Sequence, residues 1–157
     1  MMAELKVIGY EFLHGKELLG NLTLNKQRRY VFNGHIEGYI HTTKGSVYFH
    51  TWPGFECDMR SGPKLIDWYV PNLGTFEERF AWYLHDALGY GQSLTFKETN
   101  LMLFAILHDL AHYRYTKAKV IQAAVSISSS WYGMPDENDW CYKNIGKVLT
   151  RRDTYGW

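Results

Sequence analysis

The hydrophobic pattern of the chain changes once, near residue 75, and this change limits the fold more than any other feature. Upstream, short runs of β-branched and aromatic residues are separated by Gly, Asn and Pro, which is typical of strands and turns. Downstream, apolar residues recur every three or four positions, which is typical of amphipathic helices. Strands that precede helices, and do not alternate with them, predict an α+β fold with an antiparallel sheet.

Four segments of the first part have the composition of strands: residues 5–10, 30–32, 35–41 and 46–50. The last two flank Thr43-Lys44-Gly45, and a short loop containing Gly between β-formers predicts a hairpin. Trp52-Pro53-Gly54-Phe55 then turns the chain out of the sheet, because Pro and Gly interrupt a hydrogen-bonded ladder.

The helices of the second part begin at recognisable signals. Thr75 and Thr95 are each followed three residues later by Glu, which is the pattern of a capping box. A third helix carries Val120, Ala124, Ile127 and Trp131, and Gly133 followed by Pro135 marks its expected end. We expect residues 136–150 to form a last, shorter helix. The predicted fold is therefore a small antiparallel sheet from the N-terminal half, packed against a C-terminal bundle of about four helices.

The chain has 157 residues and no repeat, low-complexity tract or linker, so we expect one domain. Its parts are a strand-rich segment (1–55), an ordered loop (56–74), a helical segment (75–150) and a short tail (151–157). Aromatic residues make up 17% of the chain and are distributed over both halves. We interpret them mainly as core and rim residues, with a stacking platform for sugars or bases as the alternative.

Charge and composition exclude several classes of protein. A net charge of +1 argues against binding to duplex nucleic acid, which usually requires a basic stripe. No apolar run is long enough to predict a membrane span, and the first residues lack the pattern of a signal peptide. Cys57 and Cys141 have no metal-site or secretory spacing, so we expect reduced thiols in a cytoplasmic setting.

One loop and one helical dipeptide carry the most information about function. The segment Gly54-Phe55-Glu56-Cys57-Asp58-Met59-Arg60-Ser61-Gly62-Pro63 is followed by His85-Asp86 on the first predicted helix. This combination resembles a family of phage and prophage proteins of unknown function, with a G-F-x-x-D-x-x-S-x-P loop and then an H-D pair. The match includes Gly54, Phe55, Asp58, Ser61 and Pro63, whereas Asn100 stands where the family usually has Asp on the next helix. The resemblance covers roughly residues 45–145.

The resemblance implies the α+β fold and a phage or prophage origin, and it implies no particular activity. It also implies a host bacterial cytoplasm, or incorporation in the virion, as the location. The partners that it suggests are a phage particle or a host protein.

The residue types allow two kinds of chemistry and one structural alternative. Asp58, His85, Asp86 and Asn100 offer a mixed oxygen and nitrogen set, which suits Zn, Mn or Fe and would activate a bound water. Without a metal, a His beside a carboxylate can act as a general base. Adjacent side chains on a helix diverge by about 100°, which argues against His85 and Asp86 sharing one metal. The structural alternative is that the same residues, with Ser61 as a cap, tie the loop to the helix by buried hydrogen bonds.

A second, weaker candidate is His108-Asp109-Leu110-Ala111-His112. Two His four residues apart on one helical face can bind a single metal, as in the HExxH pattern of zinc proteases. Here Asp replaces the Glu base, and no third ligand motif follows. The alternative is a helix end at which the two His interact with the helix dipole.

The leading functional hypothesis is therefore a phage-encoded hydrolase that uses Asp58, His85 and Asp86, with either a divalent metal or a general base. The alternative hypothesis is a non-catalytic phage protein, such as a virion component or a small host-directed binding protein.

Overall fold

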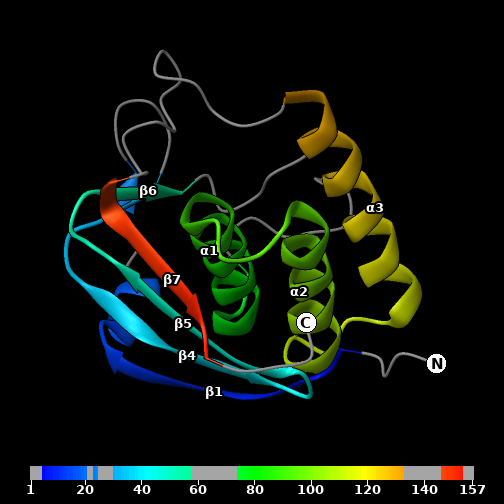
Figure 1. Ribbon diagram of the computed structural model, residues 1–157, viewed down its shortest axis with the longest axis horizontal. Helices are drawn as coiled ribbons and strands as arrows, with labels where there is room; N and C mark the ends of the chain where they lie inside the picture. The colour runs from blue at the N-terminus through cyan, green and yellow to red at the C-terminus, as the bar shows by residue number, and fades with distance from the viewer. Residues whose placement is uncertain (1–4, 21–22, 25–29, 58–73, 133–145, 154–157) are drawn as a thin grey trace.

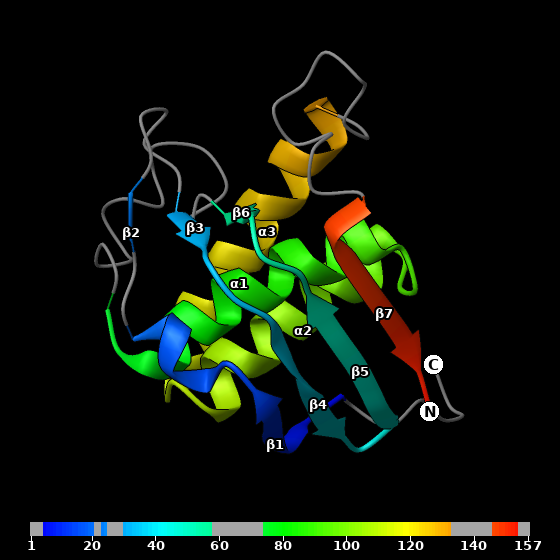
Figure 2. The same ribbon diagram turned by 90° about the vertical axis from the view of Figure 1, so that its left-hand side faces the viewer.

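The computed structural model describes residues 5–20, 23–24, 30–57, 74–132 and 146–153, with side chains of the third helix up to Ser126. Within these ranges, the first two α-helices cover one side of a four-stranded antiparallel sheet, and the third packs on the second (Figures 1 and 2). The predicted α+β fold and antiparallel sheet are confirmed. The elements are β1 (Val7–His14), a 3-10 helix η1 (Lys16–Leu19), β2 (Thr23–Leu24), β3 (Tyr30–Phe32), β4 (Ile36–Thr42), β5 (Gly45–Thr51), β6 (Phe55–Cys57), α1 (Phe76–Gly91), α2 (Phe96–Asp109), α3 (Tyr115–Tyr132) and β7 (Val148–Arg152).

The main sheet has the strand order β1-β4-β5-β7, and β4 and β5 form the predicted hairpin around Thr43 and Lys44. Beyond the turn at Trp52 the chain enters β6, which pairs with β3 in a smaller sheet of order β2-β3-β6. Gly54 has a φ of 94°, a left-handed conformation that suits glycine and lets the chain enter β6. Because β6 extends to Cys57, strand structure reaches two residues into the segment that we predicted as a loop. Residues 58–73 lie outside the described residues.

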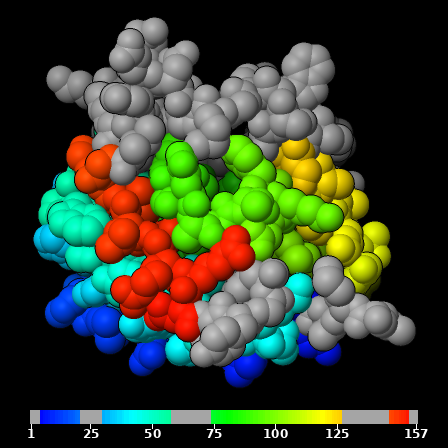
Figure 3. Space-filling view, viewed as in Figure 1, coloured from blue at the N-terminus to red at the C-terminus, as the bar shows by residue number. Residues whose placement is uncertain are grey.

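The predicted fourth helix is wrong where the structure describes it. Val148–Arg152 forms a strand that pairs with β5, so the described residues contain three α-helices instead of about four. Thr150 and Arg152 attach this strand to the helices: Ser93 Oγ lies 2.7 Å from Thr150 Oγ1, and the Arg152 guanidinium donates to the Ser93 carbonyl and to Glu98. Figure 3 shows β7, in red, lying directly against the green helical residues. The remaining part of that prediction, residues 136–145, lies outside the described residues.

Both predicted capping boxes are confirmed. In each, the Thr side chain accepts from the amide three residues on, while the Glu carboxylate accepts from the Thr amide, at Thr75/Glu78 and Thr95/Glu98. These reciprocal bonds satisfy N–H groups that a helix start leaves without partners. The capping boxes fix the first residue of α1 and of α2. The position of that residue determines which later side chains of each helix face the core.

Helix α3 packs on α2 through Ala118, Ile121 and Val125, which are buried. Of the four residues that we named on this helix, Ala124 is partly buried against the core and Val120 is exposed. The side chains of Ile127 and Trp131 lie outside the described part of the helix.

The two faces of the main sheet differ in character. Residues such as Ile36, Ile40, Val47 and Phe49 point towards α1 and are buried, and Phe12 packs on Phe76 and Phe80 of that helix. The alternate residues form what we call the outer face, which no described helix covers: Glu11, Glu37, Tyr39, His41, Ser46, Tyr48, His50, Leu149 and Arg151. Most of the aromatic residues in the described ranges lie in the core, as predicted, but Tyr39 and Tyr48 lie on this outer face.

Candidate functional site

Helix α1 carries the predicted His85-Asp86 pair on the part of the helix that faces β6 and α2. Both side chains are largely buried, with exposed fractions of 10% for His85 and 12% for Asp86. His85 Nδ1 lies 3.7 Å from Asp86 Oδ1. The two ends are thus closer than the divergence of adjacent helical positions suggested, and an imidazolium at His85 would lie beside a carboxylate.

Strand β6 supplies the neighbour on one side of this pair. Cys57 is fully buried, and its thiol donates a hydrogen bond to Asp86 Oδ2 across 2.9 Å. The pairing of Cys57 with Tyr30 in the small sheet holds the thiol at this position. Asp86 therefore connects β6 to α1.

Helices α2 and α3 supply the neighbours on the other side. Asn100 is buried in the first half of α2, and its side-chain oxygen lies 2.9 Å from His85 Nε2. The Asn100 amide nitrogen donates to Ser126 Oγ on α3 across 3.1 Å, and Ser126 donates in turn to the Gln122 carbonyl. We call this series, Cys57–Asp86–His85–Asn100–Ser126, the polar chain.

The direction of each hydrogen bond in the polar chain determines the protonation of His85. Ser126 uses its proton on a carbonyl, so its oxygen must accept from the Asn100 NH₂ group. The other end of that amide is then the oxygen, which can only accept, and His85 Nε2 must carry a proton to donate to it. In the neutral ring the lone pair consequently lies on Nδ1, the nitrogen on the side of Asp86.

The predicted site residues fall into three groups. His85, Asp86 and Asn100 come together in the polar chain, as we expected. Gly54 forms the turn before β6, and Phe55 is a buried core residue. Asp58, Ser61 and Pro63 lie outside the described residues, so their predicted roles in the loop stay predictions.

The described part of the predicted metal set does not suit a metal. His85 Nε2 and Asn100 Oδ1 bind each other, and Asp86 Oδ2 accepts from a thiol. These three residues are thus positioned as a hydrogen-bonded series and not as converging ligands. Among the described residues no group of three His, Cys, Asp or Glu side chains has an arrangement that could hold an ion.

The helical premise of the second candidate is wrong. Helix α2 ends at Asp109, and His112 lies beyond it with a φ of 60° in the left-handed region. His108 and His112 therefore do not share a helical face. His108 Nδ1 instead donates to the Tyr113 carbonyl across 2.8 Å.

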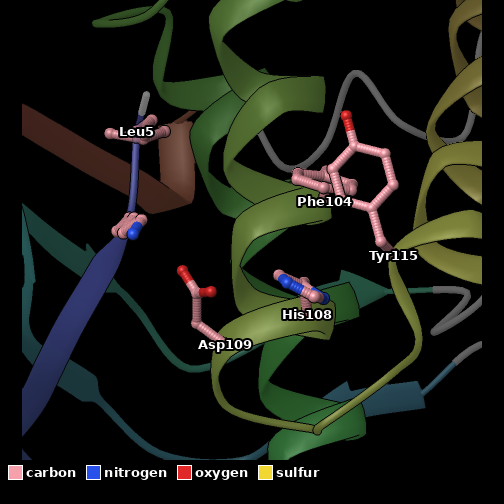
Figure 4. A pocket seen from close by; sticks show the side chains of 6 residues that line it. Leu5, Phe104, His108, Asp109 and Tyr115 are labelled. Carbon is pink, nitrogen blue, oxygen red and sulfur yellow. The ribbon is translucent and has the colours of Figure 1, made fainter. Parts of the chain in front are cut away.

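Asp109 also has a different role from the predicted base. Its Oδ2 accepts from the Val7 amide across 2.8 Å, which ties the end of α2 to the start of β1. Beside it lies a hollow of about 240 Å³, which Leu5, Lys6, Phe104, His108 and Tyr115 also line. Figure 4 shows Leu5 opposite Phe104, His108 and Tyr115. Phe104 stacks on His108, with ring centroids 5.6 Å apart, so the imidazole is packed as a wall of this hollow.

Sequence reasoning missed two members of the polar chain. Cys57, for which the sequence predicts only a reduced thiol, is buried and binds Asp86. Ser126 belongs to no motif in the sequence, yet it orients Asn100. The only available signal was that Cys57 directly precedes Asp58 in the motif.

Comparisons with known proteins give no further guidance, because no protein family model, curated protein or solved structure matches this chain. None of the helices in the described ranges is both long and apolar enough to cross a membrane. The molecule is thus defined here as an α+β protein with a buried polar chain, and its place in the phage family stays a prediction.

Proposed function

We propose that this protein is a hydrolase of phage or prophage origin in which His85 acts as the general base. The observation that supports the proposal is the polar chain, which assigns a proton to Nε2 and a lone pair to Nδ1. A base needs such a lone pair in a fixed direction, with the other nitrogen held by a partner.

In this proposal the reacting group is a water or a hydroxyl that must reach His85 Nδ1, an atom that the described residues bury. Nδ1 accepts its proton as the oxygen attacks an electrophilic centre of the substrate, and the ring becomes an imidazolium. The Asp86 carboxylate, 3.7 Å away, stabilises that positive charge, while Asn100 keeps the ring from rotating. Asp58 would act from the adjacent loop, as the resemblance implies.

The origin and location follow from the resemblance alone. A phage or prophage protein of this kind would act in the cytoplasm of the host bacterium or be carried in the virion. Its partner would be a phage particle or a host protein.

The test is a hydrolysis screen of purified, untagged protein on chromogenic esters, phosphodiesters, glycosides and peptides. We expect turnover of one class that falls at least a hundredfold in His85→Ala, because a positioned base contributes about 10²–10⁴-fold to rate. His41→Ala is the matched control, since His41 lies on the outer face and takes no part in the polar chain. Equal rates in His85→Ala and in the unmodified protein would exclude His85 as the base.

A chelator arm separates the two forms of the hypothesis. If His85 acts without a metal, prolonged dialysis against a chelator leaves both the rate and the melting temperature unchanged. A rate that is lost on chelation and restored by one divalent metal would instead support the metal-dependent form.

A second candidate function is a non-catalytic phage protein in which the same residues act as an internal clamp. The thiol of Cys57 bound to Asp86 favours it, because this bond joins β6 to α1 as a structural contact would. Asn100 in place of an acidic residue favours it too, since an amide suits a hydrogen-bonded network better than a metal site. If His85→Ala unfolds readily and no substrate class is turned over, the clamp is the better description.

A further inference from the structure

Four of the seven His of this chain gather on or beside the outer face of the sheet: His14, His35, His41 and His50. This face is the opposite side of the sheet from the polar chain. His50 lies on β5, and His35 directly precedes β4, so the hairpin geometry places both side chains at the same end of the sheet.

The His35–His50 pair has a closely defined geometry. His35 Nδ1 lies 3.0 Å from His50 Nε2, and the His50 ring stacks on Trp52, with centroids 3.9 Å apart and planes 13° from parallel. His35 is exposed, whereas the side chain of His50 has only 17% of its surface exposed. One partner of the pair is thus fixed by packing, and the other can adjust its rotamer.

The hydrogen bonds at His50 Nδ1 determine which ring nitrogen of His50 carries the proton. The Tyr48 hydroxyl donates to Glu37, so its oxygen is left to accept from His50 Nδ1, 3.3 Å away. Nε2 of the neutral His50 ring therefore carries the lone pair and points at His35. A carboxylate that holds the far nitrogen of an imidazole, here through a tyrosine, is the outer-shell arrangement that orients metal-binding His.

We propose that His35 Nδ1 and His50 Nε2 together bind one divalent transition-metal ion, with Cu²⁺ preferred over Zn²⁺. In the hydrogen-bonded pair the two nitrogens face each other, 3.0 Å apart, so the exposed His35 ring has to turn before both nitrogens can face one ion. His50 stays in place, because it is packed on Trp52. Imidazole nitrogen suits Cu²⁺, Ni²⁺ and Zn²⁺, and the affinity of such sites for divalent ions generally peaks at Cu²⁺.

Binding needs one proton to move within His35. In the hydrogen-bonded pair its Nδ1 donates to His50, and on metal binding the proton leaves Nδ1 and Nε2 takes one up from solvent. The ring stays neutral throughout. Water completes the coordination of the ion, because Glu37 faces the other nitrogen of His50, with its oxygen 4.0 Å from Nδ1.

The experiment is calorimetric titration of the untagged full chain with Cu²⁺, Ni²⁺ and Zn²⁺, combined with electron paramagnetic resonance of the Cu²⁺ complex. We expect one Cu²⁺ site per chain, bound more tightly than Ni²⁺ and Zn²⁺, with hyperfine splitting from two nitrogens. His35→Ala and His50→Gln should each weaken Cu²⁺ binding at least tenfold. Gln at position 50 keeps a side chain that can cover Trp52, so the variant is expected to fold.

Matched variants make the outcome decisive. His41→Ala removes an outer-face His that binds Ser46 and Glu11, and it should bind Cu²⁺ like the unmodified protein. Glu37→Gln should weaken binding about 10–100-fold, the usual effect of removing an outer-shell carboxylate. Unchanged affinity in the His35→Ala/His50→Gln double variant, an equal loss in His41→Ala, or Zn²⁺ bound more tightly than Cu²⁺ would each overturn the proposal.

Discussion

Replacing Asn100 by Leu tests the polar chain directly, because Leu has a similar volume but no polar atoms. The substitution leaves the His85 Nε2–H donor buried without its acceptor, which costs about 1–3 kcal/mol. Ser126 loses one neutral hydrogen bond, worth about 0.5–1.5 kcal/mol, but keeps its bond to the Gln122 carbonyl. Burial of the Leu side chain offsets on the order of 1–2 kcal/mol of this loss.

We therefore expect Asn100→Leu to lower the free energy of unfolding by about 1–3 kcal/mol. For a chain of this length that corresponds to a fall in melting temperature of roughly 2–12 °C. Urea denaturation followed by circular dichroism measures the free energy of unfolding, and a thermal scan with the same probe measures the melting temperature.

The double variant His85→Leu/Asn100→Leu is the control for this reasoning. It removes donor and acceptor together, so no buried group is left stranded, and its destabilisation should be about 1–2 kcal/mol smaller than the sum of the single effects. If Asn100→Leu is as stable as the unmodified protein, or the two effects simply add, a stabilising hydrogen bond between His85 and Asn100 is refuted.

Two further predictions concern the frame around the site. Burial raises the pKa of Glu98, but bonds from Thr95 and the Arg152 ion pair lower it more, and the net pKa is below the ordinary value of 4.5. The stability that the ionised Glu98 carboxylate contributes is thus complete above pH 4.5 and is lost as the pH falls through the lower pKa of the folded state. The difference in melting temperature between Glu98→Gln and the unmodified protein should therefore become smaller from pH 7 to pH 3. A gap that is independent of pH would contradict this. Gly38→Ala should lower the melting temperature by about 4–8 °C, for a cost of about 2 kcal/mol, because the added Cβ would lie 2.2 Å from a carbonyl oxygen of β1. The control is Gly9→Ala, which should leave the melting temperature nearly unchanged because a Cβ at Gly9 meets open space.

The features that the sequence predicted correctly depend on residues close together in the chain. Thr75 and Glu78 interact across three residues, and the β4–β5 hairpin closes over two, so local chemistry is enough to place them. Strand β7 pairs with β5 about a hundred residues earlier, and nothing within Val148–Arg152 indicates which partner it will find. The local pattern there is compatible with a helix or a strand, and only the free edge of β5 decides between them.

The same contrast between local and long-range contacts explains which parts of the candidate sites were predicted correctly. The His-Asp dipeptide can be recognised in the sequence because its two residues are adjacent. The prediction that His112 lies on the same helix as His108 is wrong, because no Gly or Pro marks the end of α2 at Asp109. The end is instead closed by a left-handed His112 and by a bond from the Tyr113 amide to the Leu107 carbonyl. A non-glycine residue in that conformation cannot be read from its identity.

The two histidine arrangements show why ring orientation is the most useful functional information in this fold. His85 and His50 lie on opposite sides of the main sheet. In each residue one ring nitrogen donates a hydrogen bond, and a neighbouring hydroxyl group determines the direction of that bond. The Ser126 hydroxyl donates elsewhere and so accepts from Asn100, which leaves the Asn100 oxygen to accept from His85. The Tyr48 hydroxyl likewise donates elsewhere and so accepts from His50 Nδ1. In each series the hydroxyl proton goes to a group that can only accept, the Gln122 carbonyl or the Glu37 carboxylate, so the position of the imidazole lone pair follows without reference to any ligand. A sequence lists these histidines as equivalent residues, whereas the fold gives His85 a lone pair on Nδ1 inside the protein and His50 a lone pair on Nε2 at its surface.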